Sequence, residues 1–184
     1  MSTLKISTKR LRIRNLKPDD IADFHVYRSN KEVVKYQGFD VFTKQQATDF
    51  IQLQQNKKFG NAGEWVQYGI ENRKTGKIIG DCAIKLEQND IRIAEIGITI
   101  SHLEQKKGYA KESIYGILDF LFQIENFHRV KAIVDTKNIA SIQLLKSVGF
   151  RQEGHFIENI FFNNKWGSEY QFAILKKEYQ KTSK

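Results

Sequence analysis

The stretch "EQKKGYAKES", residues 104–113, separates two patterns of different period and thereby decides the fold. The preceding run "IRIAEIGITI", residues 91–100, has the composition of a strand, whereas the following residues place apolar side chains at helical spacing. That apolar stripe consists of Ile114, Ile117, Leu118, Leu121 and Phe122. We therefore expect a strand, a loop and a helix that begins near Gly108. Such a loop gathers the unpaired N–H groups and the positive dipole end of the helix, which favours a bound phosphate.

The residues before this junction predict an antiparallel meander. Two further strand-like runs, "EWVQYGIEN" at 64–72 and "IIGDCAIKL" at 78–86, are separated from each other and from the junction by segments rich in turn-forming residues. Nearer the start, "KRLRIRNL" at 9–16 alternates charged and apolar residues and predicts the first strand. Two helices are expected between that strand and the meander, the second beginning at a Thr43–Gln46 capping box.

The residues after the long helix predict one more helix among three strands. "RVKAIVD" at 129–135 is typical of a strand, and "NIASIQLLKSVGF" at 138–150 is typical of a short helix that ends at Gly149. The remaining residues predict a long hairpin that turns at Asn163-Asn164.

The resulting order, βααβββαβαββ, is that of an α+β protein. We expect a single domain over residues 1–184, with a mixed, mostly antiparallel twisted sheet of about seven strands and four main helices. Its ordered core is expected at residues 8–176, followed by a polar tail at 177–184.

The composition excludes several classes of function. The formal net charge is +9, but the lysines are spread along the chain without a nucleic-acid-binding signature, so no specific nucleic-acid partner is expected. The sequence has no signal peptide and no apolar run of roughly 18 residues, so we expect a cytoplasmic protein without a membrane partner. Cys82 is the single cysteine and the four histidines are scattered, so neither a disulfide nor a metal site is expected.

Two motifs carry a resemblance to a known family. Gln105-Lys106-Lys107-Gly108-Tyr109-Ala110 resembles the [RQ]-x-x-G-x-[GA] loop by which N-acetyltransferases of the GNAT superfamily hold the pyrophosphate of acetyl-CoA. The segment at 138–150 resembles the second signature of that superfamily, N-x-x-S-x-x-x-x-x-x-x-G-F. Its matching residues are Asn138, Ser141, Gly149 and Phe150. The expected order of elements is also that of the GNAT fold.

One branch of the superfamily is more similar than the others. "TKRLRIRNLKPDD" at 8–20 and "AEIGITI" at 94–100 resemble the branch that includes ribosomal-protein N-terminal acetyltransferases. In that branch the loop usually carries a tryptophan and a further glycine ahead of the Gly-x-Ala, where this chain has glutamine and lysine. The lysine still has a backbone N–H group, but the flexibility of the extra glycine is lost.

The resemblance implies an acetyl-CoA-dependent enzyme in which an amine attacks the thioester directly, in a ternary complex. Backbone N–H groups of residues 105–110 would hold the pyrophosphate, and Asn138 would be a further contact. In the GNAT fold a bulge separates the strand "EIGITI" at 95–100 from its neighbour, and Gly97 would tolerate such a bulge. The freed main chain of Ile98, Thr99 and Ile100 would then pair with the pantetheine and donate to the thioester carbonyl.

Glu95 and Ser141 are the predicted catalytic residues. Glu95 would remove a proton from the amine, directly or through water, although it could equally be a strand carboxylate in a salt bridge. Ser141 resembles the serine that protonates the departing thiolate in the branch. The alternative is that Asn138 and Ser141 cap the short helix, and both roles can hold at once.

The acceptor is expected to be a primary amine. Candidate residues for the acceptor pocket are Tyr36, Phe39, Phe42 and Trp65, although aromatic residues at such spacings are more often core. The branch resemblance favours a protein N-terminus, with a small-molecule amine as the other candidate. The net charge argues mildly against polycationic acceptors such as polyamines and suits the phosphates of CoA. The enzyme would act as a monomer or homodimer; a CoA-sensing or nucleic-acid-contacting module without catalysis is the rival interpretation.

Overall fold

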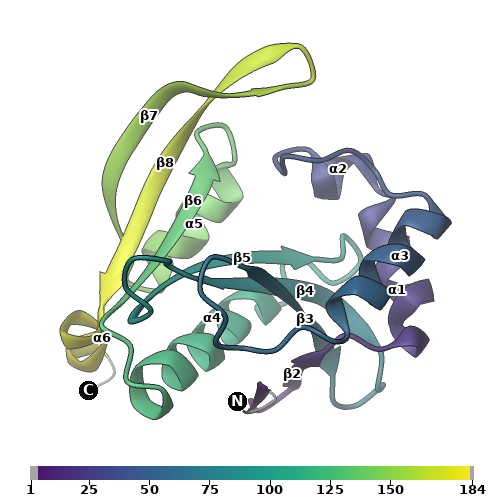
Figure 1. The fold of residues 1–184 in the computed structure, drawn as a ribbon, viewed down its shortest axis with the longest axis horizontal. Coiled ribbons are helices and arrows are strands. Elements are labelled where there is room, and N and C mark those ends of the chain that lie inside the picture. The colour runs from purple at the N-terminus through teal and green to yellow at the C-terminus, as the bar shows by residue number, and fades with distance from the viewer. Residues whose placement is uncertain (1–3, 183–184) are drawn as a thin grey trace.

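A single eight-stranded sheet runs through the protein, whose computed structural model describes residues 4–182 (Figure 1). In space the strands follow the order β1-β2-β3-β4-β5-β6-β8-β7, and every neighbouring pair is antiparallel except β5 and β6. The strands are β1 (Lys5–Ser7), β2 (Leu11–Asn15), β3 (Trp65–Asn72), β4 (Ile78–Leu86), β5 (Ile93–Ile100), β6 (Arg129–Asp135), β7 (Arg151–Phe162) and β8 (Lys165–Leu175). The predicted mixed, mostly antiparallel α+β fold is confirmed.

The helices pack around this sheet and bury two apolar clusters. The helical elements are η1 (Pro18–Asp20), α1 (Ile21–Arg28), α2 (Lys31–Val34), α3 (Lys44–Gln54), α4 (Tyr109–Asp119), the π-helical turn η2 (Phe120–Ile124), α5 (Ile139–Ser147) and α6 (Lys176–Thr182). The larger cluster includes the whole predicted apolar stripe, whose side chains on α4 and η2 are all buried. The smaller cluster lies between α1 and α3 and contains Phe24 and Ile51. No helix in residues 4–182 is long and apolar enough to cross a membrane.

Short elements at the two ends are the main difference from the predicted order. Strand β1 adds an eighth strand to the predicted seven or so, and its three residues are too few to show a period in the sequence. Helix α6 occupies part of the stretch expected to be a polar tail, and its Tyr179 is 3% exposed. The hairpin turn at Asn163 and Asn164 is as predicted, with φ angles of 50° and 58°.

The sheet opens between β5 and β6, and this opening positions the functional site. The two strands pair only from Ile93 to Glu95, whereas β5 stays paired with β4 as far as Ile100. Beyond that point β6 turns away together with β8 and β7 (Figure 1). The predicted separation is therefore present, but the β4–β5 register shows no bulge at Gly97. A Cβ atom at Gly97 would meet no atom within 4 Å, so this residue faces open space.

Candidate active site

The loop before α4 presents free backbone donors, as the sequence predicts. Gly108 is the N-cap residue of α4 and has a φ of 80°, in the left-handed region that favours glycine. Within residues 4–182, the backbone N–H groups of residues 108–111 donate no hydrogen bond. Four free donors at the positive end of an 11-residue helix fit the pyrophosphate of acetyl-CoA.

Lys106 adopts a left-handed backbone conformation, which favours glycine. Its φ is 62°, so the loop has two left-handed residues, Lys106 and Gly108, two positions apart. Alternating left-handed residues turn successive N–H groups toward one point, which makes an anion-binding concavity. A left-handed residue that carries a side chain costs roughly 1 kcal/mol.

Arg10, which the sequence analysis did not select, holds this loop from outside. Its Nε donates to Glu112 Oε2 at 2.6 Å, and its guanidinium lies over the Tyr109 ring, 4.4 Å from the centroid. A third contact joins Arg10 to the carbonyl oxygen of Lys107 at 3.0 Å. Thr8 Oγ1 adds a 2.6 Å hydrogen bond to Glu112. The turn between β1 and β2 therefore fixes the first turn of α4.

A cavity of about 440 Å³ lies in front of the loop. All predicted cofactor contacts line it except Lys107, whose Nζ instead forms a 3.0 Å ion pair with Glu104. The predicted residues that line it are Ile98, Thr99, Ile100, Gln105, Lys106, Gly108, Tyr109, Ala110, Asn138 and Ser141. The cavity therefore joins the free main chain of β5 to the N-termini of α4 and α5.

Asn138 and Ser141 cap α5, as one of the two interpretations expected. Asn138 Oδ1 accepts a 3.2 Å hydrogen bond from the Ser141 backbone N–H. Within residues 4–179, the hydroxyl of Ser141 makes no hydrogen bond, and the residue lines the cavity. The capping interaction uses the amide of Ser141, so its hydroxyl is left available to a ligand.

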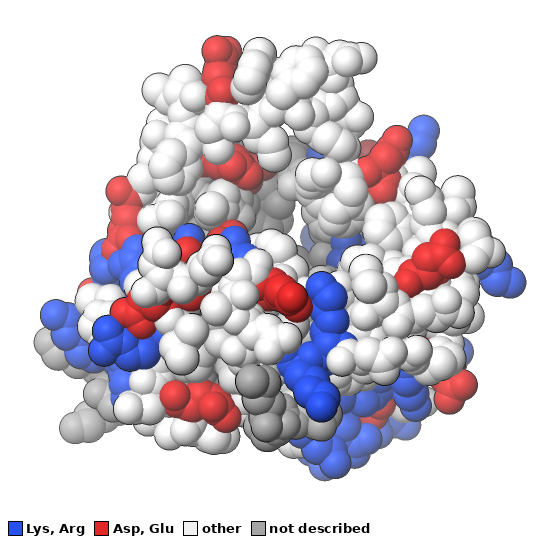
Figure 2. Space-filling model, viewed as in Figure 1, with Lys and Arg blue, Asp and Glu red and all other residues white. Residues whose placement is uncertain are grey.

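A second cavity, of about 600 Å³, continues from the first. Seven residues line both cavities: Tyr36, Gln37, Ile98, Thr99, Asn138, Ser141 and Leu144. The predicted acceptor residues Tyr36, Phe39, Phe42 and Trp65 all line the second cavity. It corresponds to the hollow between the β7–β8 hairpin and the lobe of α1–α3 (Figure 2). A ligand in each cavity would thus meet at the opening between β5 and β6.

Glu95 lies in the wall of the second cavity and is held by two lysines. It is 8% exposed, and its Oε2 is 2.8 Å from Lys85 Nζ and 3.5 Å from Lys131 Nζ. Lys85 also lies over the Trp65 ring, 4.8 Å from the centroid. Glu95 is therefore an ion-paired strand carboxylate, and it also faces the space that an acceptor would occupy.

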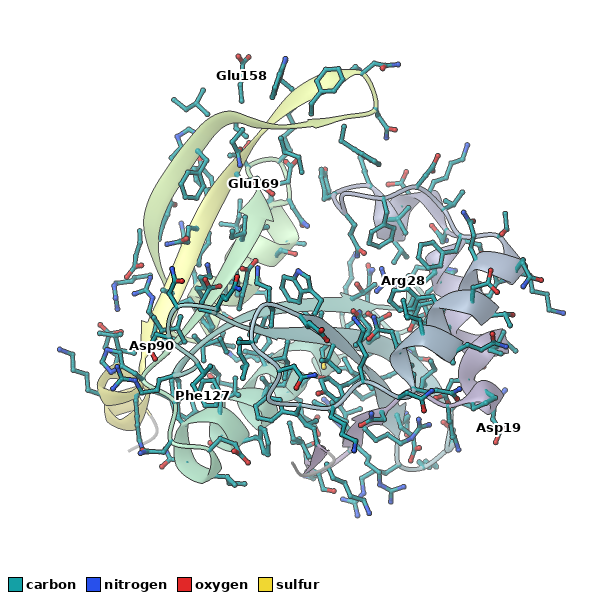
Figure 3. All side chains as sticks on the ribbon, viewed as in Figure 1. Asp19, Arg28, Asp90, Phe127, Glu158 and Glu169 are labelled. Atoms are coloured by element: carbon teal, nitrogen blue, oxygen red, sulfur yellow. The ribbon has the colours of Figure 1, made fainter. Side chains whose placement is uncertain are left out.

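A buried polar chain connects α1 to β5, and it too was missed from the sequence. Asp81 on β4 is fully buried and accepts from both Arg28 and Tyr27, the latter at 2.8 Å. Burial, reinforced by Asp81, raises the pKa of Tyr27 well above its usual range. Arg28 Nη1 donates a 2.6 Å hydrogen bond to Gln37 Oε1, and Gln37 Nε2 donates a 2.8 Å hydrogen bond to Thr99 Oγ1. Figure 3 shows Arg28 reaching from α1 toward the sheet. The signal in the sequence was an aspartate inside the apolar run at 78–86.

Comparison with known proteins identifies the family of this chain. Residues 10–151 match the acetyltransferase (GNAT) domain family, and the chain belongs to that family. It is 34% identical over 176 residues to YnaD, an uncharacterized N-acetyltransferase of Bacillus subtilis strain 168, covering 96% of this chain and 99% of YnaD. It is 28% identical over 171 residues to a spermidine N(1)-acetyltransferase of Vibrio cholerae, covering 92% and 95% of the two chains.

Solved structures of the same family superpose closely. An acetyltransferase (GNAT family) from Bacillus anthracis has a TM-score of 0.86 at 27% identity, over 95% of this chain and all of the other. A putative ribosomal-protein-serine acetyltransferase from Vibrio cholerae has a TM-score of 0.78 at 22% identity, over 94% and 97% of the two chains, and shows the fold alone. Family and relatives make this protein an acetyl-CoA-dependent N-acetyltransferase rather than a non-catalytic module.

Proposed function

We propose that the enzyme acetylates the primary amine of a small cationic molecule that enters the second cavity. The observation that carries this proposal is the meeting of the two cavities at Thr99 and Ser141. Acetyl-CoA in the first cavity would place its thioester where an amine from the second can reach it. Bringing both reactants to one opening replaces a bimolecular encounter by a reaction within a complex.

The first cavity supports binding of the CoA phosphates through main-chain donors. The N–H groups of residues 108–111 would face the pyrophosphate, and Lys106 would add a positive charge from the cavity wall. The edge of β5 from Ile98 to Ile100 would pair with the pantetheine amides because β6 has turned away, although the Ile100 carbonyl also accepts a 3.2 Å hydrogen bond from Gln105 Nε2. Acetyl-CoA supplies the activated acetyl group in this arrangement.

Two side chains would handle the protons of the transfer. Glu95 would take one proton from the ammonium, which leaves an amine with a free electron pair. That electron pair forms the new C–N bond while the C–S bond breaks and its electrons pass to sulfur. The second proton leaves the nitrogen, and Ser141 would supply the proton that converts the thiolate into the CoA thiol. Overall one proton is released to solvent for each amide formed.

Carboxylates in the second cavity support a cationic acceptor. Asp135 on β6 and Glu169 on β8 are direct cross-strand neighbours and line the cavity together with Glu95. Like charges directly opposite each other on neighbouring strands repel. Within residues 4–179, no salt bridge to Asp135 or Glu169 offsets this repulsion, so a cationic ligand would reduce it. Figure 3 shows Glu169 on the β8 side of the hollow. The local charge of this cavity therefore differs from the net charge of +9 for the whole chain, and the net charge gives no argument against a polyamine acceptor.

A protein N-terminus is the second candidate acceptor. The similarity of residues 8–20 and 94–100 to the ribosomal-protein branch favours it, as does the fold shared with the ribosomal-protein-serine acetyltransferase. Against it, the β7–β8 hairpin reaches the segment at Gly38 beside the cavity, since a Cβ atom at Gly38 would lie 3.9 Å from Ile160 Cδ1. A thin, flexible amine can pass this contact more easily than a folded protein surface can.

The experiment is an acceptor screen that follows release of the CoA thiol. Spermidine, a monoamine of similar length and a peptide with a free N-terminal serine are the three decisive acceptors. Preference for spermidine over the monoamine is expected, and Glu169→Gln should reduce that preference. Efficient acetylation of the peptide alone would establish the protein N-terminus instead. Glu95→Gln should lower kcat with little change in acetyl-CoA affinity, and an unchanged pH–rate profile would exclude Glu95 as the base.

A further inference from the structure

We propose that the side-chain hydroxyl of Thr99 donates a hydrogen bond to the thioester carbonyl oxygen, and that Gln37 and Arg28 orient it for that task. The proposal rests on the proposed function, because it assigns a role at the point where the two cavities meet. It differs from the main-chain role of Thr99 implied by the family resemblance. Thr99 would be a catalytic residue, whereas Gln37 and Arg28 would be positioning residues.

The orientation of the Gln37 amide is fixed by the chemistry of its neighbours. Arg28 can only donate, and its Nη1 lies 2.6 Å from Gln37 Oε1. The Val33 carbonyl can only accept, and it lies 3.4 Å from Gln37 Nε2. The amide nitrogen must therefore point toward Thr99 Oγ1, 2.8 Å away. Gln37 is the donor in that contact and Thr99 the acceptor.

The proton of Thr99 is consequently free to be given to something else. Because the hydroxyl oxygen accepts from Gln37, its O–H must point in another direction. Within residues 4–179 no acceptor receives this hydrogen, although Thr99 is only 8% exposed. Thr99 lines both cavities, so its hydroxyl hydrogen is available to a ligand at the place where thioester and amine would meet. A nearly buried hydroxyl with an unused donor indicates a ligand atom that accepts from it.

The ion pair between Arg28 and Asp81, at the beginning of this series of hydrogen bonds, makes the orientation of Gln37 rigid. Arg28 is 3% exposed, and Asp81, which is fully buried, holds its Nε and Nη2. Gln67 and Tyr27 also donate to Asp81, so this carboxylate cannot turn away from its partners. A hydrogen-bond donor that is already oriented toward the developing negative charge does not have to reorganise during the reaction. This preorganisation is the principal way in which oxyanion-hole donors accelerate acyl transfer. The buried ion pair thus has a function beyond packing.

Thr99→Val and Thr99→Ser form the primary test. Valine keeps the shape and loses the hydroxyl, and kcat should fall about 100-fold, as for loss of one oxyanion-hole donor. Serine keeps the hydroxyl and should retain most of the rate, with an unchanged KM for acetyl-CoA in both variants. Thr48→Val is the control, since within residues 4–179 the Thr48 hydroxyl on α3 bonds only to the Lys44 carbonyl, and Thr48 lines neither cavity.

Gln37→Glu is the sharper variant because it should keep the fold. A glutamate at this position would still bind Arg28, but it would also accept from Thr99 and turn the hydroxyl hydrogen away from the cavities. The thermal midpoint should therefore be unchanged or higher, while kcat falls as in Thr99→Val. A purely structural role of Gln37 predicts no loss of rate.

A spectroscopic measurement tests the contact without turnover. Acetyl-CoA labelled with ¹³C at the thioester carbonyl gives an isotope-shifted band, and a hydrogen bond from Thr99 lowers its frequency. The band should move up in Thr99→Val and Gln37→Glu but not in Thr99→Ser. An unshifted band, or a kcat within threefold of wild type in both Thr99→Val and Gln37→Glu, would overturn the inference. A wild-type protein that shows the band shift but acetylates no amine would refute only the proposed acceptor; failure to bind acetyl-CoA would refute both.

Discussion

Arg10 and Tyr109 stack against each other at the start of α4, with the guanidinium carbon 4.4 Å from the ring centroid. Arg10 lies at the turn before β2, and Tyr109 is the first residue of the helix whose free N–H groups we propose bind the phosphates of acetyl-CoA. Since 99 positions separate them in the chain, this contact is a tertiary brace on a loop whose geometry has to be kept.

Removing the brace should weaken acetyl-CoA binding without abolishing it. Arg10→Ala removes the stacking and the ion pair to Glu112, which together are worth about 1 kcal/mol at a partly exposed site. We expect the dissociation constant for acetyl-CoA to rise several-fold by calorimetry. Lys9→Ala removes the same charge from the neighbouring position; an equal loss of affinity in this variant would mean that only charge matters.

Glu112 should make stability depend on pH in the acid range. Burial would raise the pKa of Glu112, but hydrogen bonds from Thr8 and Arg10 outweigh it and hold the pKa below its usual range. A carboxyl group with a depressed pKa in the folded state stabilises the fold above its unfolded pKa of about 4.3. That stabilisation is lost as the pH falls through the folded value.

Glu112→Gln cannot titrate and therefore isolates this effect. Chemical unfolding at pH 7 and at pH 3 should show a large difference between wild type and variant at pH 7, and a smaller one at pH 3. A difference that does not change with pH would contradict the ionic role of Glu112.

A negative side chain at the N-cap of α4 should abolish acetyl-CoA binding. Gly108→Glu places a carboxylate against the pyrophosphate site and also strains a residue with a φ of 80°. Gly76→Glu is the matched control, because Gly76 has a φ of 72° in an open turn with no atom near its Cβ position. The two variants should lose similar stability, whereas thermal stabilisation by acetyl-CoA should survive only in Gly76→Glu. Stabilisation of a folded Gly108→Glu would show that the loop is not the phosphate site.

Lys106→Gly should separate backbone geometry from charge. Glycine removes the strain of a left-handed lysine, so the free energy of unfolding should rise by up to about 1 kcal/mol. Loss of the lysine charge from the cavity wall should at the same time reduce acetyl-CoA affinity. Thermal unfolding with and without acetyl-CoA measures both effects. Unchanged affinity would indicate that the Lys106 backbone, and not its ammonium group, serves the cofactor.

Local patterns predicted the elements and the loop before α4, because both depend on consecutive residues. The apolar stripe of α4 and η2, the cap at Asn138 and the glycine at position 108 each depend on neighbours a few residues away, and each lies where it was expected. The sequence also led to the opening beside β5, through the family resemblance and not through the pattern itself.

What the sequence could not provide were contacts between distant residues. Arg10 bonds to Lys107, 97 positions further along the chain, and Gln37 bonds to Thr99, 62 positions further along. The local distribution of charge also depends on contacts between residues that are distant in the sequence. A net count over 184 residues did not reveal that Asp135 and Glu169 come together on one wall, because cross-strand register brings them there.

The divergence of β5 and β6 has a consequence for how such an enzyme can change over time. The groups that it leaves unpaired on β5, which we propose bind acetyl-CoA, belong to the peptide backbone, and no ordinary substitution removes them. The acceptor side of the second cavity consists of side chains from the α1–α3 region and the β7–β8 hairpin. Single substitutions can change these side chains one at a time. Evolution can thus exchange one amine for another on this scaffold while the donor half of the reaction is inherited unchanged.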